Sequence, residues 1–130
     1  MLNGGCHCGQ IRYQALGATF HETNCHCSIC RRTTGAPYVA WFSVRRDAFR
    51  FTQGDPVRYA SSAQGTRAFC PRCGTQLTFT HADYADEIDV TIGSLDDPQR
   101  VAPQDHTRTS SRLSWVKPGD GLPEFSEARD

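Results

Sequence analysis

The sequence lacks the long apolar runs, the excess charge and the N-terminal pattern that mark several large classes of protein. Its longest apolar run is Tyr38–Phe42, whereas a membrane-spanning helix needs about 20 apolar residues. The segment Met1–Cys6 has neither a basic region nor an apolar stretch, so we expect no secretory signal and a cytoplasmic location. Fourteen basic residues balance fourteen acidic ones, which argues against a nucleic-acid partner and against a membrane surface.

What the sequence does have is cysteine, with 7 among its 130 residues and all 7 in three tight groups. Where thiols are kept reduced, clustered cysteines act as metal ligands and not as disulfides. An odd total also fits complete disulfide pairing poorly. The groups are Cys6-His7-Cys8, Cys25-His26-Cys27-Ser28-Ile29-Cys30 and Cys70-Pro71-Arg72-Cys73.

The pattern of apolar residues predicts a single, mainly β domain with little helix. A chain of this length is one domain on the usual scale of about 100–200 residues, and its apolar residues mostly alternate with polar ones, as in Ile88-Asp89-Val90-Thr91-Ile92. Short alternating segments between turns indicate antiparallel strands. Ser28–Thr34 is the only segment that we expect to be helical. We expect residues 99–114 to be irregular, the domain to span residues 1–116, and residues 117–130 to form a loosely ordered tail.

Four of the cysteines can close one metal site. Cys70 and Cys73 form a Cys-x-x-Cys knuckle followed by Gly74, and glycine tolerates the positive φ that closes such a turn. The knuckle needs two more ligands. Cys6 and Cys8 are alternate residues, and on a strand they would share a face with Cα atoms about 6.7 Å apart. Four cysteines around one zinc ion make a structural site, which here would join two distant strands.

The other three cysteines suggest an open site. Cys25, Cys27 and Cys30 come together if the chain turns helical after Ser28. Three thiolates leave one position on a zinc ion free, as in catalytic zinc sites, and such a soft site suits zinc or copper(I). Seven cysteines therefore divide into one closed and one open site, which is typical of an enzyme.

Two alternatives to this division remain open. A fourth protein ligand, His21 or His106, could close the three-cysteine site. Alternatively, Cys6 and Cys8 could join Cys25 and Cys27, although that arrangement splits a local triplet.

The residues between and after the ligands have their own interpretations. His7 and His26 each lie between two cysteines, so in an extended chain they point away from the metal and act as neighbours of the ligands. Arg31 and Arg32 could meet the carboxylates of a bound thiol or form a solvated helix face. Tyr38, Trp41 and Phe42 are expected in the core, with one of them lining the site.

Several longer motifs resemble the glutathione-dependent formaldehyde-activating enzyme family, which also includes centromere protein V. The resemblance spans nearly the whole chain. Its motifs are Gly4-Gly5-Cys6-His7-Cys8-Gly9, Cys25-His26-Cys27-Ser28-Ile29-Cys30-Arg31-Arg32, Thr34-Gly35-Ala36-Pro37, Arg67-Ala68-Phe69-Cys70-Pro71-Arg72-Cys73-Gly74-Thr75 and Gly93-Ser94-Leu95-Asp96-Asp97-Pro98.

The resemblance implies a β-tent of packed antiparallel sheets stapled by zinc. It also implies a zinc-dependent carbon–sulfur lyase or synthase, which acts on adducts of a small thiol, glutathione or similar, with formaldehyde or another small aldehyde. A non-catalytic zinc-binding module for protein partners is the alternative. The implied ligands are Cys6, Cys8, Cys70 and Cys73 for a structural zinc, and Cys25, Cys27 and Cys30 for a catalytic zinc.

Overall fold

The computed structural model describes residues 1–129 as strands joined by short turns, with a single α-helix, so the predicted mainly β fold is confirmed. Within these residues no helix is both long and apolar enough to cross a membrane. The strands are β1 (Leu2–Gly5), β2 (Arg12–Ala15), β3 (Phe20–Cys25), β4 (Val39–Arg45), β5 (Phe49–Gln53), β6 (Val57–Ala60), β7 (Gly65–Phe69), β8 (Gln76–His81), β9 (Glu87–Thr91) and β10 (Asp105–Thr107); the helix is α1 (Ser28–Thr34), and 3₁₀ turns cover Arg46–Ala48, Ala82–Tyr84, Ile92–Ser94, Pro98–Arg100 and Thr109–Ser111.

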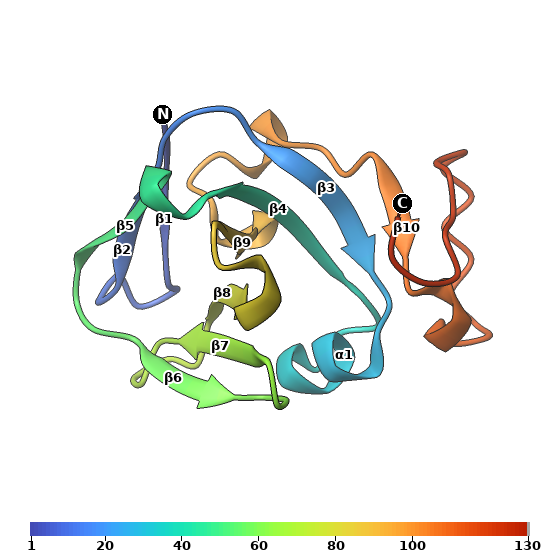
Figure 1. The fold of residues 1–130 in the computed structure, drawn as a ribbon, viewed down its shortest axis with the longest axis horizontal. Helices are drawn as coiled ribbons and strands as arrows, with labels where there is room; N and C mark the ends of the chain where they lie inside the picture. Colours follow the sequence, from blue (N-terminus) through green and yellow to red (C-terminus); the bar gives the residue numbers. More distant parts are fainter. Residues whose placement is uncertain (130) are drawn as a thin grey trace.

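The strands form two sheets (Figure 1). The smaller sheet has the order β1-β2-β5 and the larger one the order β10-β3-β4-β9-β8-β7-β6. Within residues 1–129, neighbouring strands run antiparallel except for β10 and β3, which are parallel. In Figure 1, the small sheet lies on one side of the long strands β3 and β4. Helix α1 follows β3 in the chain and lies beside the C-terminal end of that strand.

The apolar core lies between the two sheets. Side chains alternate between the two faces of a strand, so one set of residues in the large sheet points toward the small sheet. Phe42 and Val90, which are partners across β4 and β9, belong to this set and are fully buried. The residues with which they form the core are Cys6, Ile11, Tyr13, Ala15, Val44, Cys70, Leu77, Ile88, Ile92, Leu95 and Val101.

The opposite face of the large sheet carries a different set of side chains. Trp41 and Ser43 on β4 flank the core residue Phe42 and point the other way. Ser43 pairs in register with Asp89 on β9, and Asp89 pairs with Phe79 on β8. This face therefore presents aromatic and polar groups, and it forms the floor of the candidate site.

Strand β10 corrects the expectation that residues 99–114 are irregular. Asp105–Thr107 is a buried polar strand that the sequence pattern does not reveal. Its side chains are satisfied by distant partners: Asp105 accepts hydrogen bonds of 2.6 and 2.7 Å from Arg129, and Thr107 bonds Thr23 at 3.0 Å. The backbone of residues 117–129 also bonds β10, as in the 2.8 Å bond from Phe125 N to His106 O. The proposed domain boundary at residue 116 stays a prediction.

Candidate functional site

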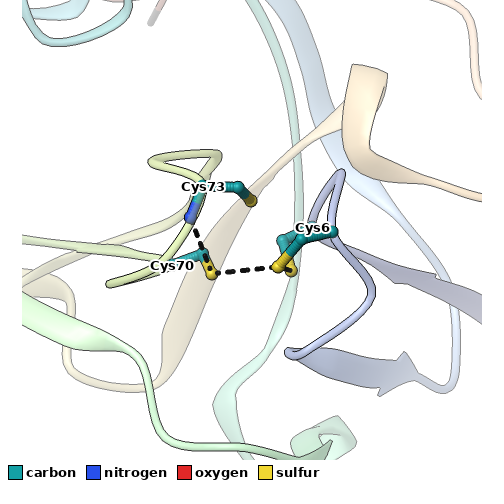
Figure 2. Close-up of side chains that lie close together, drawn as sticks. Cys6, Cys70 and Cys73 are labelled. Carbon is teal, nitrogen blue, oxygen red and sulfur yellow. Dashed lines mark hydrogen bonds between the residues drawn. The ribbon is translucent and has the colours of Figure 1, made fainter.

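The four-cysteine cluster has the geometry of a tetrahedral zinc site. Its four sulfur atoms lie within 4.8 Å of one another, with 3.6 Å between Cys6 and Cys8 and 3.7 Å between Cys8 and Cys70. Zinc–sulfur bonds of about 2.3 Å place the sulfurs of a tetrahedral site about 3.8 Å apart. Figure 2 shows Cys6 on one loop facing Cys70 and Cys73 on another. These residues fit a zinc ion.

Two turns bring these cysteines together. Cys6 and Cys8 lie in the turn between β1 and β2, and not on a strand as expected, because Gly9 has φ 82° and reverses the chain there. The knuckle that carries Cys70 and Cys73 is closed by Gly74, whose φ of 81° agrees with the reading of the sequence. Both turns follow the same rule, since only glycine adopts this conformation without strain.

Backbone and side-chain donors surround the sulfurs of the knuckle. The backbone N–H groups of Arg72 and Cys73 both donate to Cys70 Sγ at 3.4 Å. A hydrogen bond with the Thr75 hydroxyl, at 3.3 Å, lowers the pKa of Cys73 to about 5. Such donors favour thiolates, which are the form that binds metal.

The three-cysteine cluster forms where β3 passes into α1. Cys25 is the last residue of β3, Cys27 caps the helix, and Cys30 lies in its first turn. Cys27 Sγ accepts a 3.2 Å hydrogen bond from Cys30 N, so one sulfur both caps the helix and joins the cluster. The sulfurs of Cys25 and Cys30 are 3.5 Å apart, and all three sulfurs lie within 4.8 Å of one another. They too fit one zinc ion.

Close packing couples the ionisation of these three thiols. Hydrogen bonding from Cys25 and then Cys30 holds the pKa of Cys27 far below its ordinary value. Hydrogen bonding with Cys27, and to a smaller extent with Cys30, raises the pKa of Cys25. One thiolate thus forms at the expense of the others, and a cation at the cluster would relieve this competition.

The histidines that could have closed this site do not join it. Neither His21 nor His106 contributes a ring nitrogen to the cluster. His106 is fully buried and uses both ring nitrogens, with Nδ1 2.9 Å from His26 Nε2 and Nε2 2.8 Å from Asp120 Oδ2. His26 points away from the sulfurs, in agreement with its predicted place as a neighbour of the ligands. Burial lowers the pKa of His26, and the His106 ring lowers it further.

A cleft of about 910 Å³ opens beside the three cysteines. Cys25, Cys27 and Cys30 line it together with Trp41 and Phe79, whereas the four-cysteine cluster does not. The prediction that one of the aromatic residues at positions 38–42 lines the site is met by Trp41. Arg31 and Arg32 are absent from the cleft wall, and Arg31 instead donates to Ser111 O at 3.0 Å.

Arg67 is a buried cation in the wall of this cleft, with only 4% of its surface exposed. Its Nη2 donates to Cys30 Sγ at 3.5 Å and its Nε to Ser61 Oγ at 3.1 Å, but its Nη1 has no partner among residues 1–129. The guanidinium carbon lies 4.8 Å from the centre of the Phe79 ring. Sequence reasoning did not give Arg67 a role, because only the pairing of β7 with β8 directs it toward the three cysteines.

Asp89 lies in the same cleft on β9. Its carboxylate accepts a 2.6 Å hydrogen bond from Ser43 Oγ. Burial raises the pKa of Asp89 to about 6, although the Ser43 bond opposes that shift. The alternation of apolar and polar residues in the sequence placed Asp89 on the polar face of its strand, and this was the signal that could have assigned Asp89 to the site.

Comparison with known proteins gives a consistent family assignment. A model of the glutathione-dependent formaldehyde-activating enzyme family matches residues 1–111. A Halomonas elongata protein provisionally named as such an enzyme is 25% identical over 130 residues, which cover 90% of this chain and 80% of that protein. A Schizosaccharomyces pombe protein named as an uncharacterised lyase is 31% identical over 81 residues, which cover 62% of this chain and 58% of that protein. A Rhodobacter sphaeroides crystal structure shares the fold, with a TM-score of 0.62 at 22% identity over 95% of this chain and 98% of that one.

Proposed function

This chain belongs to the glutathione-dependent formaldehyde-activating enzyme family, and from that premise we propose that it is a zinc-dependent carbon–sulfur lyase or synthase. Its substrates would be a small thiol, glutathione or similar, and formaldehyde or another small aldehyde. One observation carries the proposal: the three-cysteine cluster opens into a large cleft and has no fourth protein ligand among residues 1–129, while the four-cysteine cluster lies outside that cleft. This is the division between an open catalytic and a closed structural metal site.

The residues that would hold the metals follow from the two clusters. Zinc bound by Cys25, Cys27 and Cys30 would supply a Lewis acid with a free position, which lowers the cost of forming a substrate thiolate or polarises the aldehyde oxygen. The structural zinc would be held by Cys6, Cys8, Cys70 and Cys73.

The chain's own residues would bind the substrate and balance its charge. Three thiolates are a concentrated negative charge, and Arg67 lies against one of them at Cys30 Sγ. Charge-assisted hydrogen bonds of this kind are stronger than neutral ones. Trp41 and Phe79 cover the neighbouring wall and would exclude water from the reacting atoms.

The proposed reaction forms and breaks a single carbon–sulfur bond. In synthesis, the thiol gives up its proton, its sulfur attacks the aldehyde carbon, and the carbonyl electron pair moves to oxygen, which takes a proton. In lysis, the hydroxyl loses its proton, the carbonyl re-forms, and the sulfur leaves with the bonding pair and is protonated. No oxidant or reductant is needed in either direction.

Magnetisation-transfer NMR of hemithioacetal exchange tests this proposal. We expect the zinc-loaded protein to accelerate exchange between free formaldehyde and its thiol adduct, and Cys27→Ala to abolish the acceleration. Thr33→Ala is the matched control, because Thr33 lies on the same helix but not in the cleft wall. Equal exchange rates for the wild-type protein and Cys27→Ala would remove the catalytic role and favour a zinc module that binds protein partners.

A further inference from the structure

We propose that Asp89, together with Glu87, binds the ammonium group of the thiol substrate, so that the cleft selects peptide thiols with a free amino group. The inference deepens the proposed function and rests on it, because the sulfur of the ligand is taken to lie at the three-cysteine cluster. It assigns a role to the end of the cleft that the proposed chemistry leaves unused.

The strand register places these carboxylates in the same cleft as the cysteines but well away from them. Cys25 pairs with Val39 on β4, whereas Asp89 pairs with Ser43 on the same strand. Four residues of strand separate these two partners, which is about 13 Å. Residues paired in register share a face of the sheet, and the cleft wall includes both Cys25 and Asp89. The cleft thus has a sulfur end and a carboxylate end.

The two carboxylates at the carboxylate end of the cleft have no direct ion-pair partner within residues 1–129. Most charged side chains in the cleft wall have an ion-pair partner, but neither Glu87 nor Asp89 forms an ion pair within residues 1–129. Arg67 lies in the same row as Asp89 and is one positive charge against two carboxylates, so this end of the cleft keeps a net negative charge. The pairs formed by other residues of the wall are His81 with Asp83 at 4.0 Å, Arg108 with Glu127 at 3.4 Å, and Arg129 with Asp105 at 2.6 Å.

A cation in contact with Asp89 would stabilise its ionised carboxylate. It is held by the Ser43 hydroxyl at 2.6 Å, and a hydroxyl is a neutral partner for a charged group. Burial of a carboxylate without a counter-charge is unfavourable, and an ammonium group in contact with it offsets that cost. With its pKa raised to about 6, Asp89 is still mostly ionised at neutral pH.

Arg67 gives an independent sign that the cleft floor binds a polar ligand. It lies in the same row as Phe79 and Asp89, on β7, and its Nη1 is a buried donor with no partner in the described part of the chain. Buried donors in native proteins are almost always paired. A carbonyl or carboxylate oxygen of the ligand could take this position after a small shift of the side chain. Peptide thiols carry both such oxygens and an ammonium group several bonds from the sulfur.

Calorimetric titration of the zinc-loaded protein with two matched thiols tests the inference. Glutathione has a free ammonium group, whereas in N-acetylglutathione the same nitrogen is a neutral amide. We expect the wild-type protein to bind glutathione about tenfold more tightly or better. Asp89→Asn, which keeps the shape of the side chain, should remove that preference, and Glu87→Gln should reduce it. Asp55→Asn is the control, because Asp55 is exposed and lies outside the cleft.

The outcomes separate this inference from the proposed function. Equal affinity of the wild-type protein for the two thiols would overturn the inference and leave the reaction standing, and that comparison needs no variant. A preference for glutathione that persists in Asp89→Asn would likewise overturn the role of Asp89. Failure of both thiols to bind, with both clusters loaded with zinc, would overturn the inference and the proposed function together.

Discussion

Single residues in the cleft carry charges that the fold itself does not neutralise. Asp89 is a partly buried carboxylate whose bonded partner is the neutral hydroxyl of Ser43, and Arg67 keeps one buried N–H without a partner among residues 1–129. Uncompensated groups of this kind lower the stability of a folded protein. Functional sites are where such costs are concentrated, because the ligand supplies the missing partner.

The loss of folding stability caused by the ionised Asp89 carboxylate can be measured from the pH dependence of unfolding. A carboxyl group whose pKa is raised on folding from 3.8 to about 6 stabilises the native state below pH 4, and that contribution is lost as the pH rises through 6. We expect Asp89→Asn to be more stable than the wild-type protein by roughly 3 kcal/mol at pH 7, and the two to be equally stable near pH 3.5. Urea unfolding at the two pH values measures this difference.

The matched comparison for that experiment is Asp47→Asn, in which an exposed, ion-paired carboxylate is lost. Its change in stability should be small at both pH values. A loss of stability in Asp89→Asn at pH 7 would show that the charged form of Asp89 is favourable in the free protein, contrary to the expectation.

The connection between β3 and α1 is the element on which the three-cysteine cluster depends. His26 lies in this connection, and its backbone N donates to Thr107 O on β10 at 3.0 Å. Its side chain begins a buried hydrogen-bond chain that runs through His106 to Asp120. The C-terminal segment thereby helps to position Cys25 and Cys27, which flank His26.

Removal of Asp120 should therefore weaken metal binding at one cluster only. We expect Asp120→Ala to lower the zinc affinity of the three-cysteine cluster by about tenfold, since partners of this kind fix the ligands in place, while the four-cysteine cluster keeps its affinity. Competition with a chromophoric chelator would show one of the two zinc equivalents released more readily. Glu124→Gln is the control, because the Glu124 carboxylate pairs with Arg112 at the surface and is not a member of the His26–His106–Asp120 chain. Unchanged release from Asp120→Ala would exclude this dependence.

At the level of the whole molecule, the four-cysteine cluster joins the two sheets. One of its turns connects β1 with β2 in the small sheet, and the other connects β7 with β8 in the large sheet. A metal ion at this point would link segments that are 62 residues apart at Cys8 and Cys70. The free energy of structural zinc binding, about 10–16 kcal/mol in small peptides, is as large as the stability of a whole domain.

The two clusters should consequently differ in their effect on stability. We expect Cys73→Ser to lose one zinc ion and to melt more than about 10 °C below the wild-type protein, and chelation to have a similar effect. Cys27→Ala should melt within a few degrees of the wild type, because its cluster lies at a helix end beside the cleft. Thermal melts followed by circular dichroism, with metal content measured in parallel, test this contrast. Equal losses in the two variants would contradict the division into structural and catalytic sites.

Features that depend on local spacing were predictable from the sequence. Cysteines two or three positions apart lie close together in a turn or helix, so each of the three cysteine groups followed from the chain alone, whereas the structure decided that Cys6 and Cys8 meet Cys70 and Cys73. The helix at Ser28–Thr34 and the turn at Gly74 also followed from the chain alone. Strand alternation also placed Asp89 opposite the core residues Ile88 and Val90.

Only the tertiary structure decided which distant residues complete the site. Arg67 meets Cys30 across 37 positions and His26 meets His106 across 80, and nothing in the local sequence around either residue fixes such a partner. Strand register and sheet order set these contacts, because a shift of one residue turns every side chain to the other face. Strand β10 was missed for the same reason, since its buried polar side chains are stabilised by partners elsewhere in the chain. The sequence by itself determined the candidate metal ligands and the class of fold, because both depend on local spacing and alternation, and the packing of the large sheet determined the cleft beside the three-cysteine cluster.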